Sequence, residues 1–268
     1  MLSKSNIKFI KSLGQKKYRA ETHFFLAEGN KLVNDLIPCF DCELLIATAT
    51  WLADHSSAHA GERIQVTQED IDKASLLKNP QQVIGVFRQA NHTLHPHQLT
   101  GKLSLALDGI QDPGNLGTII RLADWFGIEN IICSPDTVDI YNPKTVQASM
   151  GAIGHVQVHY TPLPDLIRSL AIDNNVPIYG AFLEGENIYH QSLSNRGLIV
   201  MGNEGNGISQ DIRHLVSRKL YIPNYPEDRK TSESLNVALA TAIICAEFRR
   251  TKNLSSVSGS PLVSIKSN

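Results

Sequence analysis

Short apolar runs alternate with helical segments through the second half of the chain, and this alternation constrains the fold more than any other feature. Strands are predicted over residues 103–107, 130–133, 155–159, 176–179 and 198–201, and helices over residues 117–126, 143–150 and 234–250. Strands separated by helices indicate a parallel sheet that carries helices on both faces. The expected fold class of this half is therefore α/β, with a mostly parallel sheet.

A smaller α/β domain is predicted ahead of it, over residues 1–90. Its expected strands lie at residues 24–27, 43–47, 64–66 and 82–87, and its expected helices at residues 29–37 and 68–77, the second with Thr67 as its N-cap. Residues 91–101 are polar and contain three histidines, which predicts a linker. Residues 102–250 then form the second domain. The Ser-rich residues 251–268 lack periodicity and are predicted to be a disordered tail.

The bulk properties of the chain fit a cytoplasmic protein. Its 268 residues are enough for two domains, and its hydrophobic fraction of 42% is typical of a globular chain. No apolar run is long enough to cross a bilayer, and the amino terminus has no apolar signal core. The four cysteines are scattered and suggest no disulfide framework. We expect neither secretion nor a membrane anchor.

Three weaker patterns are not interpreted as functional sites. Cys39 and Cys42 have the C-x-x-C spacing, but a zinc site needs further ligands and no second pair exists. The three linker histidines have no cysteine or acidic neighbours, so a role as surface residues is the simpler interpretation. No G-x-G-x-x-G segment follows the first strand of either half, which argues against a dinucleotide site. No metal is expected.

Two polar loops follow predicted strands and carry candidate site residues. In the first, QDPGNLGTIIR, Asn115 is placed to cap the following helix, and Arg121 lies about a turn and a half further on. In the second, MGNEGNGIS, the glycines allow a ligand to approach the main chain closely. Glu204 lies among them beside a buried strand, where a carboxylate needs a cationic partner, and we expect Arg121 to be that partner.

A third polar loop precedes the last predicted helix. Ile222 and Pro223 end a strand, because proline cannot continue a ladder of hydrogen bonds. Ser232 or Ser234 is expected to cap the helix, which leaves the amide of Asn236 free for a ligand. Each loop also has a structural explanation as an ordinary cap or turn, and for Asn115 and Arg121 taken alone that explanation is the stronger one.

In this order, the three loops resemble the three signature motifs of the SpoU family of RNA ribose 2′-O-methyltransferases, part of the SPOUT superfamily. Asn115, Gly117 and Arg121 match the first motif, residues 202–205 the second, and Ser-Leu-Asn-Val at residues 234–237 the third. The resemblance implies a SPOUT α/β-knot in the second half, with a trefoil knot. Residues 16–36 resemble the family's substrate-binding domain, an α/β module like certain ribosomal proteins.

The resemblance also implies roles for individual residues. The implied catalytic residues are Arg121, Asn115, Glu204, Ser234 and Asn236. S-adenosylmethionine would be surrounded by the main chain around Leu183, Gly202, Ile222 and Leu235, with Asn236 also in contact. Residues 224–231 make the third loop longer than the family's usual short version, and this affects the substrate side of the pocket.

The implied reaction moves a methyl group from S-adenosylmethionine to a ribose 2′-hydroxyl of RNA, with ribosomal RNA as the expected substrate. Arg121 would hold a phosphate, stabilise the developing alkoxide and accept its proton, although a guanidinium holds its own proton strongly. Glu204 and Asn115 would orient it. A homodimer formed through the carboxyl-terminal domain is also implied. A transfer RNA substrate, methylation of a base, and a non-catalytic RNA-binding protein remain as alternatives.

The amino-terminal segment carries an excess of positive charge although the net charge of the chain is −1. Residues 1–31 contain seven basic side chains and two acidic ones, a net charge of +5. Such a segment can follow a phosphate backbone, and a solvated helix face explains the same charge equally well. The residues predicted to bind RNA are Lys16, Lys17, Arg19 and Lys31.

Overall fold

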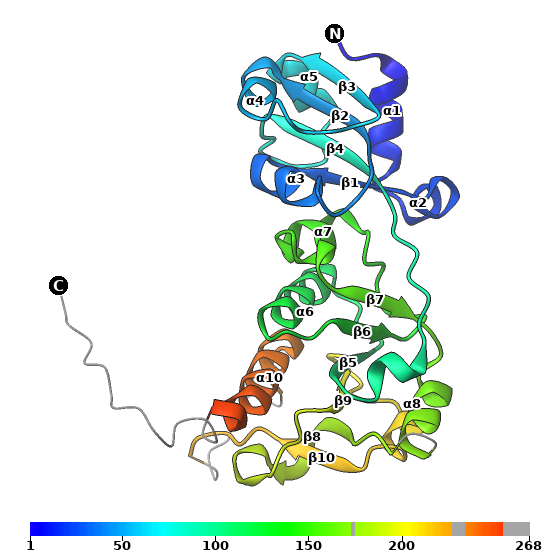
Figure 1. Ribbon diagram of the computed structural model, residues 1–268, viewed down its shortest axis with the longest axis vertical. Coiled ribbons are helices and arrows are strands. Elements are labelled where there is room, and N and C mark those ends of the chain that lie inside the picture. Colours follow the sequence, from blue (N-terminus) through cyan, green and yellow to red (C-terminus); the bar gives the residue numbers. More distant parts are fainter. Residues whose placement is uncertain (173–174, 227–233, 254–268) are drawn as a thin grey trace, which may run out of the picture.

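The structure, a computed structural model, describes residues 1–172, 175–226 and 234–253. Two sheets follow one another along the molecule, a four-stranded sheet near the amino terminus and a six-stranded sheet built from the second half of the chain (Figure 1). No helix in these ranges is both long enough and apolar enough to cross a membrane.

The first sheet has the strand order β1-β4-β2-β3. These strands are β1 (Phe24–Glu28), β2 (Cys42–Thr48), β3 (Glu62–Val66) and β4 (Val83–Arg88). β4 is antiparallel to β1 and β2, whereas β2 and β3 are parallel. The helices are α1 (Lys4–Ser12), α2 (Lys16–Thr22), α3 (Asn30–Leu36), α4 (Ala49–Asp54) and α5 (Gln68–Ala74).

The second sheet has the order β10-β8-β9-β5-β6-β7, and every pair of neighbours in it is parallel. Its strands are β5 (Leu103–Asp108), β6 (Asn130–Cys133), β7 (Gln157–Tyr160), β8 (Ile178–Asn187), β9 (Gly197–Gly202) and β10 (Arg218–Tyr221). The central strands β5, β6 and β9 are almost continuously buried, as expected for a sheet covered on both faces. The α/β fold class with a parallel sheet is therefore confirmed.

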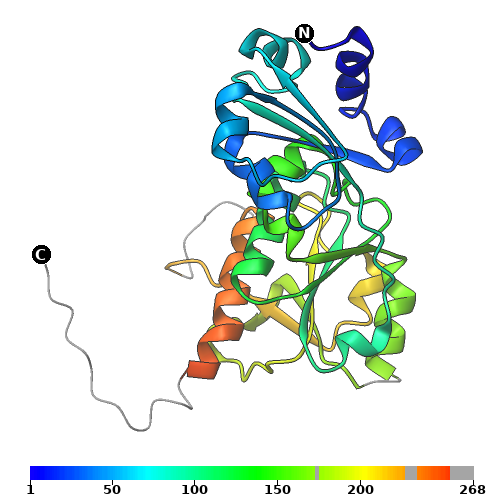
Figure 2. The same ribbon diagram turned by 45° about the horizontal axis from the view of Figure 1, so that its top comes forward.

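Helices cover both faces of the second sheet. α6 (Pro113–Trp125), α7 (Pro143–Ser149) and α10 (Val237–Asn253) pack on one side, where α6 and α10 lie next to each other (Figure 2). α8 (Leu163–Ile172) and α9 (Gln210–Arg213) bury their apolar residues in a separate cluster with Ile132 and Val200. Short 3-10 helices, η1 (Pro96–Leu99), η2 (Ala152–Gly154) and η3 (Ile188–His190), complete the fold.

Most predicted strands and helices are found, and the differences have local causes. Thr67 caps α5 as expected, because its hydroxyl accepts a hydrogen bond from the amide of Asp70. α6 begins at Pro113 and not at residue 117, because Asp112 is its N-cap and accepts from the amide of Asn115 at 2.8 Å. The prediction that Asn115 caps this helix is therefore wrong. β8 extends to Asn187, well beyond the predicted residue 179, because β10 pairs alongside it.

Three expectations concern residues that are wholly or partly outside the described ranges. The disordered tail was predicted from residue 251, but α10 extends to Asn253, and residues 254–268 are outside the described part. Most of the longer third loop falls at residues 227–233, which are likewise outside it. The trefoil knot implied by the resemblance stays a prediction, because the path of the chain between residues 226 and 234 is not described.

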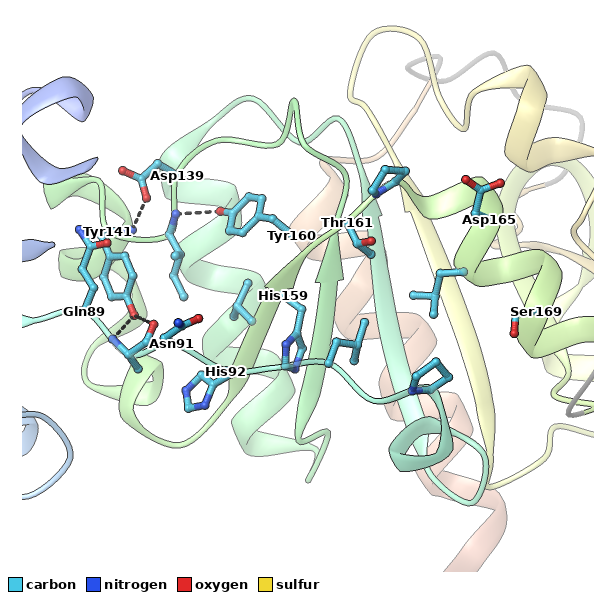
Figure 3. Close-up of a pocket in the computed structure, with 17 residues that line it drawn as sticks. Gln89, Asn91, His92, Asp139, Tyr141, His159, Tyr160, Thr161, Asp165 and Ser169 are labelled. Atoms are coloured by element: carbon cyan, nitrogen blue, oxygen red, sulfur yellow. Dashed lines mark hydrogen bonds between the residues drawn. The ribbon is translucent and has the colours of Figure 1, made fainter. Parts of the chain in front are cut away.

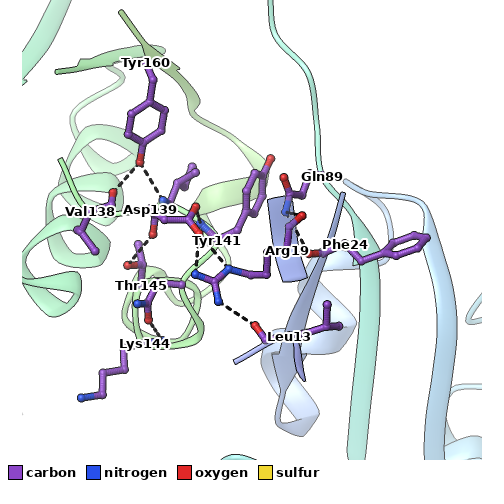
Figure 4. A network of polar contacts seen from close by, with 12 residues as sticks. Leu13, Arg19, Phe24, Gln89, Val138, Asp139, Tyr141, Lys144, Thr145 and Tyr160 are labelled. Atoms are coloured by element: carbon purple, nitrogen blue, oxygen red, sulfur yellow. Dashed lines mark hydrogen bonds and ion pairs between the residues drawn. The ribbon is translucent and has the colours of Figure 1, made fainter. Parts of the chain in front are cut away.

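The two halves of the protein are joined by a buried ion pair. Arg19 of α2 is 1% exposed, and two of its nitrogens lie 2.9 and 2.7 Å from the same oxygen of Asp139 in the second half (Figure 4). A third nitrogen donates to the carbonyl of Leu13 at 2.8 Å. Beside it, the rings of Phe25 and Tyr141 lie 4.7 Å apart between centroids. Apolar and charged contacts therefore hold the first sheet directly against the second half.

The predicted linker is also held at both of its ends. The hydroxyl of Tyr141 lies 2.9 Å from the amide of Ala90, and Gln89 donates to the carbonyls of Arg19 and Phe24. Near the other end, Leu99 is 1% exposed and packs in the α8 cluster. Residues 91–101 therefore form an ordered crossing between the two sheets, and the exact domain boundaries remain a prediction.

Candidate active site

The candidate loops meet at one edge of the parallel sheet. β5 and β9 run side by side with Asp108 opposite Gly202, so the loops that follow them begin at the same level. β8 lies beside β9 with Gly180 opposite Val200, and directly after Gly180 its register with β10 shifts, so residues 181–185 form an irregular segment next to this edge. Ligands of open α/β sheets bind at the carboxyl ends of the strands. This edge is therefore the expected position of a ligand.

Two hydrogen bonds join residues from the three predicted loops. The side-chain amide of Asn236 donates to the amide oxygen of Asn115 at 3.0 Å, and the amide of Asn115 donates to a carboxylate oxygen of Glu204 at 2.7 Å. These residues are 121 and 89 positions apart in the sequence, so only the fold brings them together. The structure thus joins Asn115, Glu204 and Asn236 in one polar chain.

Glu204 has a neutral partner in place of the predicted cationic one. Asn115 binds its carboxylate, and no ion pair between Glu204 and Arg121 is found in the part of the chain that the structure describes. The predicted Arg121–Glu204 pair is therefore wrong. The physical reason is that Glu204 lies in an exposed turn, where water solvates the carboxylate and removes the need for a counter-charge.

Asn236 is the N-cap of α10. Its side-chain oxygen accepts hydrogen bonds from the amides of Ala238 at 3.0 Å and Leu239 at 3.3 Å, while its nitrogen donates to Asn115. The prediction that Ser234 caps this helix is wrong, since Ser234 lies two residues before the cap and is exposed. Ser232, the other predicted cap, is outside the described residues. Hydrogen bonds therefore hold both the oxygen and the nitrogen of the Asn236 side-chain amide in place.

Asn203, to which the sequence analysis assigned no role, organises the second loop. Its side-chain oxygen accepts from the amides of Gly205 and Asn206 at 2.9 and 3.1 Å, and its nitrogen donates to the carbonyl of Gly109 at 2.6 Å. This side chain therefore closes its own turn and ties the loop after β9 to the loop after β5. An Asn followed by Glu-Gly-Asn-Gly is a turn pattern that could have indicated this role.

The same turn needs a glycine at position 202. A Cβ atom added to Gly202 would lie 2.2 Å from the carbonyl carbon of Gly207 and 2.3 Å from the amide of Ile208. Gly207 itself has a φ of +68°, and a residue with a side chain would be strained in this left-handed conformation. The loop after β9 thus folds back on its own main chain, which is presented at the sheet edge.

Arg121 is exposed on α6. Helical spacing places it on the same face as Thr118 and Trp125, and Trp125 is 84% exposed. Within the described ranges, no hydrogen bond or ion pair joins the guanidinium of Arg121 to another residue. The carboxyl end of α6 is fixed by Arg249 of α10, which donates to the carbonyls of Phe126 and Gly127. Arg121 therefore presents a solvent-accessible guanidinium on a helix whose end is held in place.

The main-chain segments expected to contact S-adenosylmethionine lie at this edge. Leu183 is 65% exposed in the irregular segment of β8 that follows Gly180, and Leu235 is 49% exposed directly before the Asn236 cap. Ile222 follows the last residue of β10. Exposed apolar side chains beside a close-packed glycine turn suit a ligand with a flat apolar ring and hydrogen-bonding edges. The residues present therefore fit an adenosine-containing group.

Comparison with known proteins decides the family. The model of the SpoU rRNA Methylase family matches residues 102–246, and that of the MRM3-like substrate binding domain matches residues 4–85. This chain belongs to the SpoU rRNA methylase family. The family expected from the three loops is thereby confirmed, and the second match agrees with the expected substrate-binding module.

Several known proteins match this SpoU-family chain over most of its length. It is 32% identical to the 23S rRNA (guanosine(2553)-2'-O)-methyltransferase RlmP of Bacillus subtilis, covering 91% of this chain and 95% of that protein. Among solved structures, a TrmH-family protein from Porphyromonas gingivalis has a TM-score of 0.85 at 39% identity, covering 94% of this chain and 99% of the other. The AdoMet-bound rRNA methyltransferase from Sinorhizobium meliloti has a TM-score of 0.81 at 31% identity, covering 94% and 97%.

The residues predicted to bind RNA differ in their availability. Lys16 is exposed, and Lys17 is exposed with Glu21 3.9 Å away. Lys31 forms an ion pair with Asp35 at 2.5 Å on the surface of α3. Arg19 is buried in its pair with Asp139, so its predicted role in RNA binding is wrong, because no phosphate can reach it in this structure. In the sequence, Arg19 is one arginine in a segment rich in lysines, and nothing in that pattern indicates that its side chain is buried.

Metal ligands do not gather anywhere in the described part of the chain. No group of three or more His, Cys, Asp or Glu side chains in these ranges is arranged to hold an ion. All four cysteines are free thiols, and burial raises the pKa of Cys42 to about 12. Cys39 and Cys42 are therefore small structural residues of the first domain.

Replacement of Gly202 by alanine is expected to weaken S-adenosylmethionine binding at least about tenfold, because the added methyl group forces the turn at residues 202–207 to open. Isothermal titration calorimetry of the purified variant measures this directly. Gly205→Ala is the matched control, since the nearest atom to an added Cβ there is 3.5 Å away. Equal affinity of Gly202→Ala and wild type would show that this turn does not shape the donor site.

Proposed function

We propose that this SpoU-family protein is an RNA methyltransferase that transfers a methyl group from S-adenosylmethionine to a ribose 2′-hydroxyl of ribosomal RNA. The observation that carries the proposal is the polar chain Asn236–Asn115–Glu204, which brings the three family motifs together at the start of the helix that carries the accessible Arg121. Ribosomal RNA is favoured because the relative named as a 23S rRNA 2'-O-methyltransferase aligns with both halves of the chain, including the substrate-binding half.

S-adenosylmethionine, when bound, supplies a methyl group on a positively charged sulfur that an oxygen nucleophile can attack in line. The protein's task is then mainly to position the ribose hydroxyl. Arg121 binds a phosphate of the RNA and stabilises the negative charge that develops on the 2′-oxygen. A guanidinium that keeps its own proton has no lone pair to accept another, so the proton of the 2′-hydroxyl passes to solvent water as the bond between the oxygen and the methyl group forms.

The polar chain acts on the geometry of this step. Asn115 lies in the first turn of α6, and its bonds to Glu204 and Asn236 fix the start of α6 relative to the loop after β9 and the start of α10. Arg121 is carried by the same helix, about 9 Å further along its axis. Asn115, Glu204 and Asn236 therefore position Arg121 through the helix and not by touching it. Ser234 and Asn236 stand at the start of α10, where they can contact the RNA or the donor.

The RNA-binding surface in this proposal is the exposed side of α1 and α2. Five lysines on these helices are exposed, at positions 4, 8, 11, 16 and 17. A run of accessible lysines neutralises phosphates without reading sequence, and its contribution weakens as salt rises. A cytoplasmic location, where ribosomal RNA is found, is part of the same proposal.

The target RNA is tested by mapping ribose methylation in total RNA from cells with and without the gene. We expect one ribose methylation in ribosomal RNA to disappear, while those of transfer RNA are unchanged. A plasmid copy of the wild-type gene restores the modification and a copy carrying Arg121→Ala does not. A ribose methylation lost from transfer RNA alone would overturn the assignment of ribosomal RNA.

A homodimer formed through the second domain completes the proposal. On α10, Leu239, Ala242, Ile243 and Ala246 follow one another at helical spacing as an apolar stripe, and Leu239 is 59% exposed. No described residue covers Leu239. An exposed apolar helix face of this kind is typical of an interface between subunits.

Introducing a charge into this stripe is expected to separate the subunits. Leu239→Glu would place a carboxylate in an apolar interface, and the mass measured by light scattering should fall from that of a dimer to that of a monomer of 29.5 kDa. Ile172→Glu is the matched control, because Ile172 is 72% exposed on α8, on the other side of the sheet. A wild-type protein that is monomeric at micromolar concentration would contradict the proposed dimer.

A further inference from the structure

α7 packs against β1 of the first half of the protein and against α6 of the second. A Cβ atom added to Gly117 of α6 would lie 2.5 Å from the Cβ of Ala148 and 2.6 Å from the carbonyl oxygen of Thr145. The hydroxyl of Thr145 in turn donates at 3.4 Å to the carbonyl of Asp139, whose side chain binds Arg19. A short path of contacts therefore runs from α2 through α7 to α6.

α6 and α7 run in the same direction, and this determines what lies at their starts. Gly117 faces Ala148, and Asp124 near the end of α6 lies 3.3 Å from the ring of His155, shortly after α7. At both places the facing residues are 31 positions apart in the sequence. The same offset puts Lys144 beside the first residue of α6, at the sheet edge where the motif loops meet.

The side chain of Lys144 is available to a ligand. It is exposed and extends away from the network around Arg19 and Asp139 (Figure 4). α7 contains no acidic residue, and no ion pair joins Lys144 to a carboxylate among the described residues. Asp112, which precedes α6, uses its carboxylate to accept the amide of Asn115. The ammonium group of Lys144 is therefore left for an anion from outside the chain.

The main chain that leads into α7 is held in place by two tyrosines. The hydroxyl of Tyr160 accepts a hydrogen bond from the amide of Ile140 at 2.9 Å (Figure 3). The hydroxyl of Tyr141, in the same view, lies 2.9 Å from the amide of Ala90 in the linker. Lys144 is thus presented from a backbone that is already ordered, which lowers the entropic cost of binding a ligand there.

Exposed cations lie on both sides of Lys144. Lys16 stands three residues before Arg19 in α2, so helical spacing places both on the side that faces the second half, yet Lys16 is exposed. Arg121, one turn after Gly117, lies on the α7 side of α6, about 12 Å along that helix from the level of Lys144. Lys16, Lys144 and Arg121 therefore follow one another, as three exposed cations, from α2 across α7 to α6.

We propose that Lys144 binds a phosphate group of the RNA substrate within a few nucleotides of the methylated ribose, between the phosphates bound by Lys16 and by Arg121. This assignment rests on the proposed function, which supplies RNA as the ligand. An ammonium group is a point charge that binds a phosphate without reading a base. Lys144 therefore contributes to the affinity and the path of the RNA, and not to base selection or to the transfer step.

The first test measures binding of ribosomal RNA, transcribed in vitro, to the full-length protein by filter binding over a range of salt concentrations. Lys144→Ala is expected to weaken binding about tenfold and to reduce its salt slope by about one charge, and Lys144→Arg to restore affinity to within about twofold. Arg196→Ala is the matched control, because Arg196 is exposed just before β9, at the opposite edge of the sheet. Unchanged binding in Lys144→Ala, or an equal loss in Arg196→Ala, would overturn the proposal.

A second test locates the RNA beside residue 144. Lys144→Cys is combined with Cys39→Ser, which leaves only buried cysteines besides the new one. An iron–EDTA group attached to the new thiol then releases hydroxyl radicals that cleave nearby RNA, at a protein concentration that saturates binding. We expect cleavage within a few nucleotides of the methylated ribose, and none there when the group is attached through Arg196→Cys. Absence of cleavage near that ribose from position 144 would contradict the proposal.

Steady-state kinetics separate this inference from the proposed function. Lys144→Ala is expected to raise the KM for RNA about tenfold while leaving kcat and the affinity for S-adenosylmethionine unchanged, because uniform binding is lost and the transfer step is not touched. RNA binding that depends on Lys144, without methyl transfer by the wild-type protein, would refute the proposed function alone. Methyl transfer with a KM that does not change in Lys144→Ala would refute this inference alone.

Discussion

Replacing Arg121 by alanine is expected to reduce methyl transfer about a thousandfold while leaving the affinity for S-adenosylmethionine unchanged. The guanidinium is exposed on α6 and has no partner among the described residues, so its removal costs little folding free energy. What is lost is its contact with the phosphate and with the charge that develops on the ribose oxygen. Single-turnover rates with labelled donor, together with calorimetric titration of the donor, measure the two effects separately.

Two further variants sharpen the Arg121 test. Arg121→Lys keeps the charge but loses the forked geometry that binds a phosphate through two hydrogen bonds, so an intermediate rate is expected. Arg196→Ala removes an exposed arginine elsewhere in the second half and should leave the rate within about twofold of wild type. A near-normal rate for Arg121→Ala would remove Arg121 from the catalytic step.

Replacing Arg19 by alanine is expected to destabilise the protein by about 3 kcal/mol, the largest stability effect that we predict. The substitution leaves the carboxylate of Asp139 without its partner at a site where that side chain is 17% exposed, and it leaves the carbonyl of Leu13 unpaired. Denaturation by urea, followed by circular dichroism, measures the lost free energy of unfolding. Lys17→Ala, two residues away on an exposed position, should change it by less than about 0.5 kcal/mol.

The same pair of variants separates structural from RNA-binding roles. Because Arg19 is buried, Arg19→Ala should leave the salt dependence of RNA binding unaltered in the folded fraction, whereas Lys17→Ala should reduce its slope by about one charge. A large loss of RNA affinity in Arg19→Ala at full stability would show that the guanidinium reaches the RNA after all.

The sequence predicted the parts of the fold that depend on local pattern. Apolar runs such as residues 103–107 and 130–133 were recognised because a strand buried on both faces is continuously apolar. The helix over α8 was not predicted, although Leu163, Leu166, Ile167 and Leu170 have helical spacing and are buried. α1 and α2 were likewise not predicted as helices, although Ile10 in α1 and Leu13 directly after it are fully buried.

Competition between neighbouring residues explains most of the incorrect details. Asp112 and Asn115 could both cap α6, and the aspartate three positions earlier does so, which frees Asn115 to reach Glu204 and Asn236. Ser234 and Asn236 competed in the same way at α10. The sequence does not reveal which of two nearby candidate residues caps a helix, because either side chain can accept hydrogen bonds from the free amides at the helix start. The sequence could thus indicate which loops carry Asn115, Glu204 and Asn236, but not which of these side chains bond to one another.

Contacts between the two halves could not be predicted from the sequence. Arg19 and Asp139 are 120 residues apart, and neither lies in a pattern that indicates burial. The same holds for the position of Lys144 beside the start of α6, which depends on the close contact of α7 with Gly117. Sites of this kind depend on how separate layers pack, which residue spacing within one element does not determine.

The most direct test of the central claim is to incubate the purified protein with ribosomal RNA and S-adenosylmethionine labelled in its methyl group, and then to digest the RNA to nucleosides. A 2′-O-methylated nucleoside should carry the label, and the label should be absent when the Arg121→Ala variant is used. Label found in a methylated base, or no transfer to RNA under conditions where the donor binds, would contradict ribose methylation by this site.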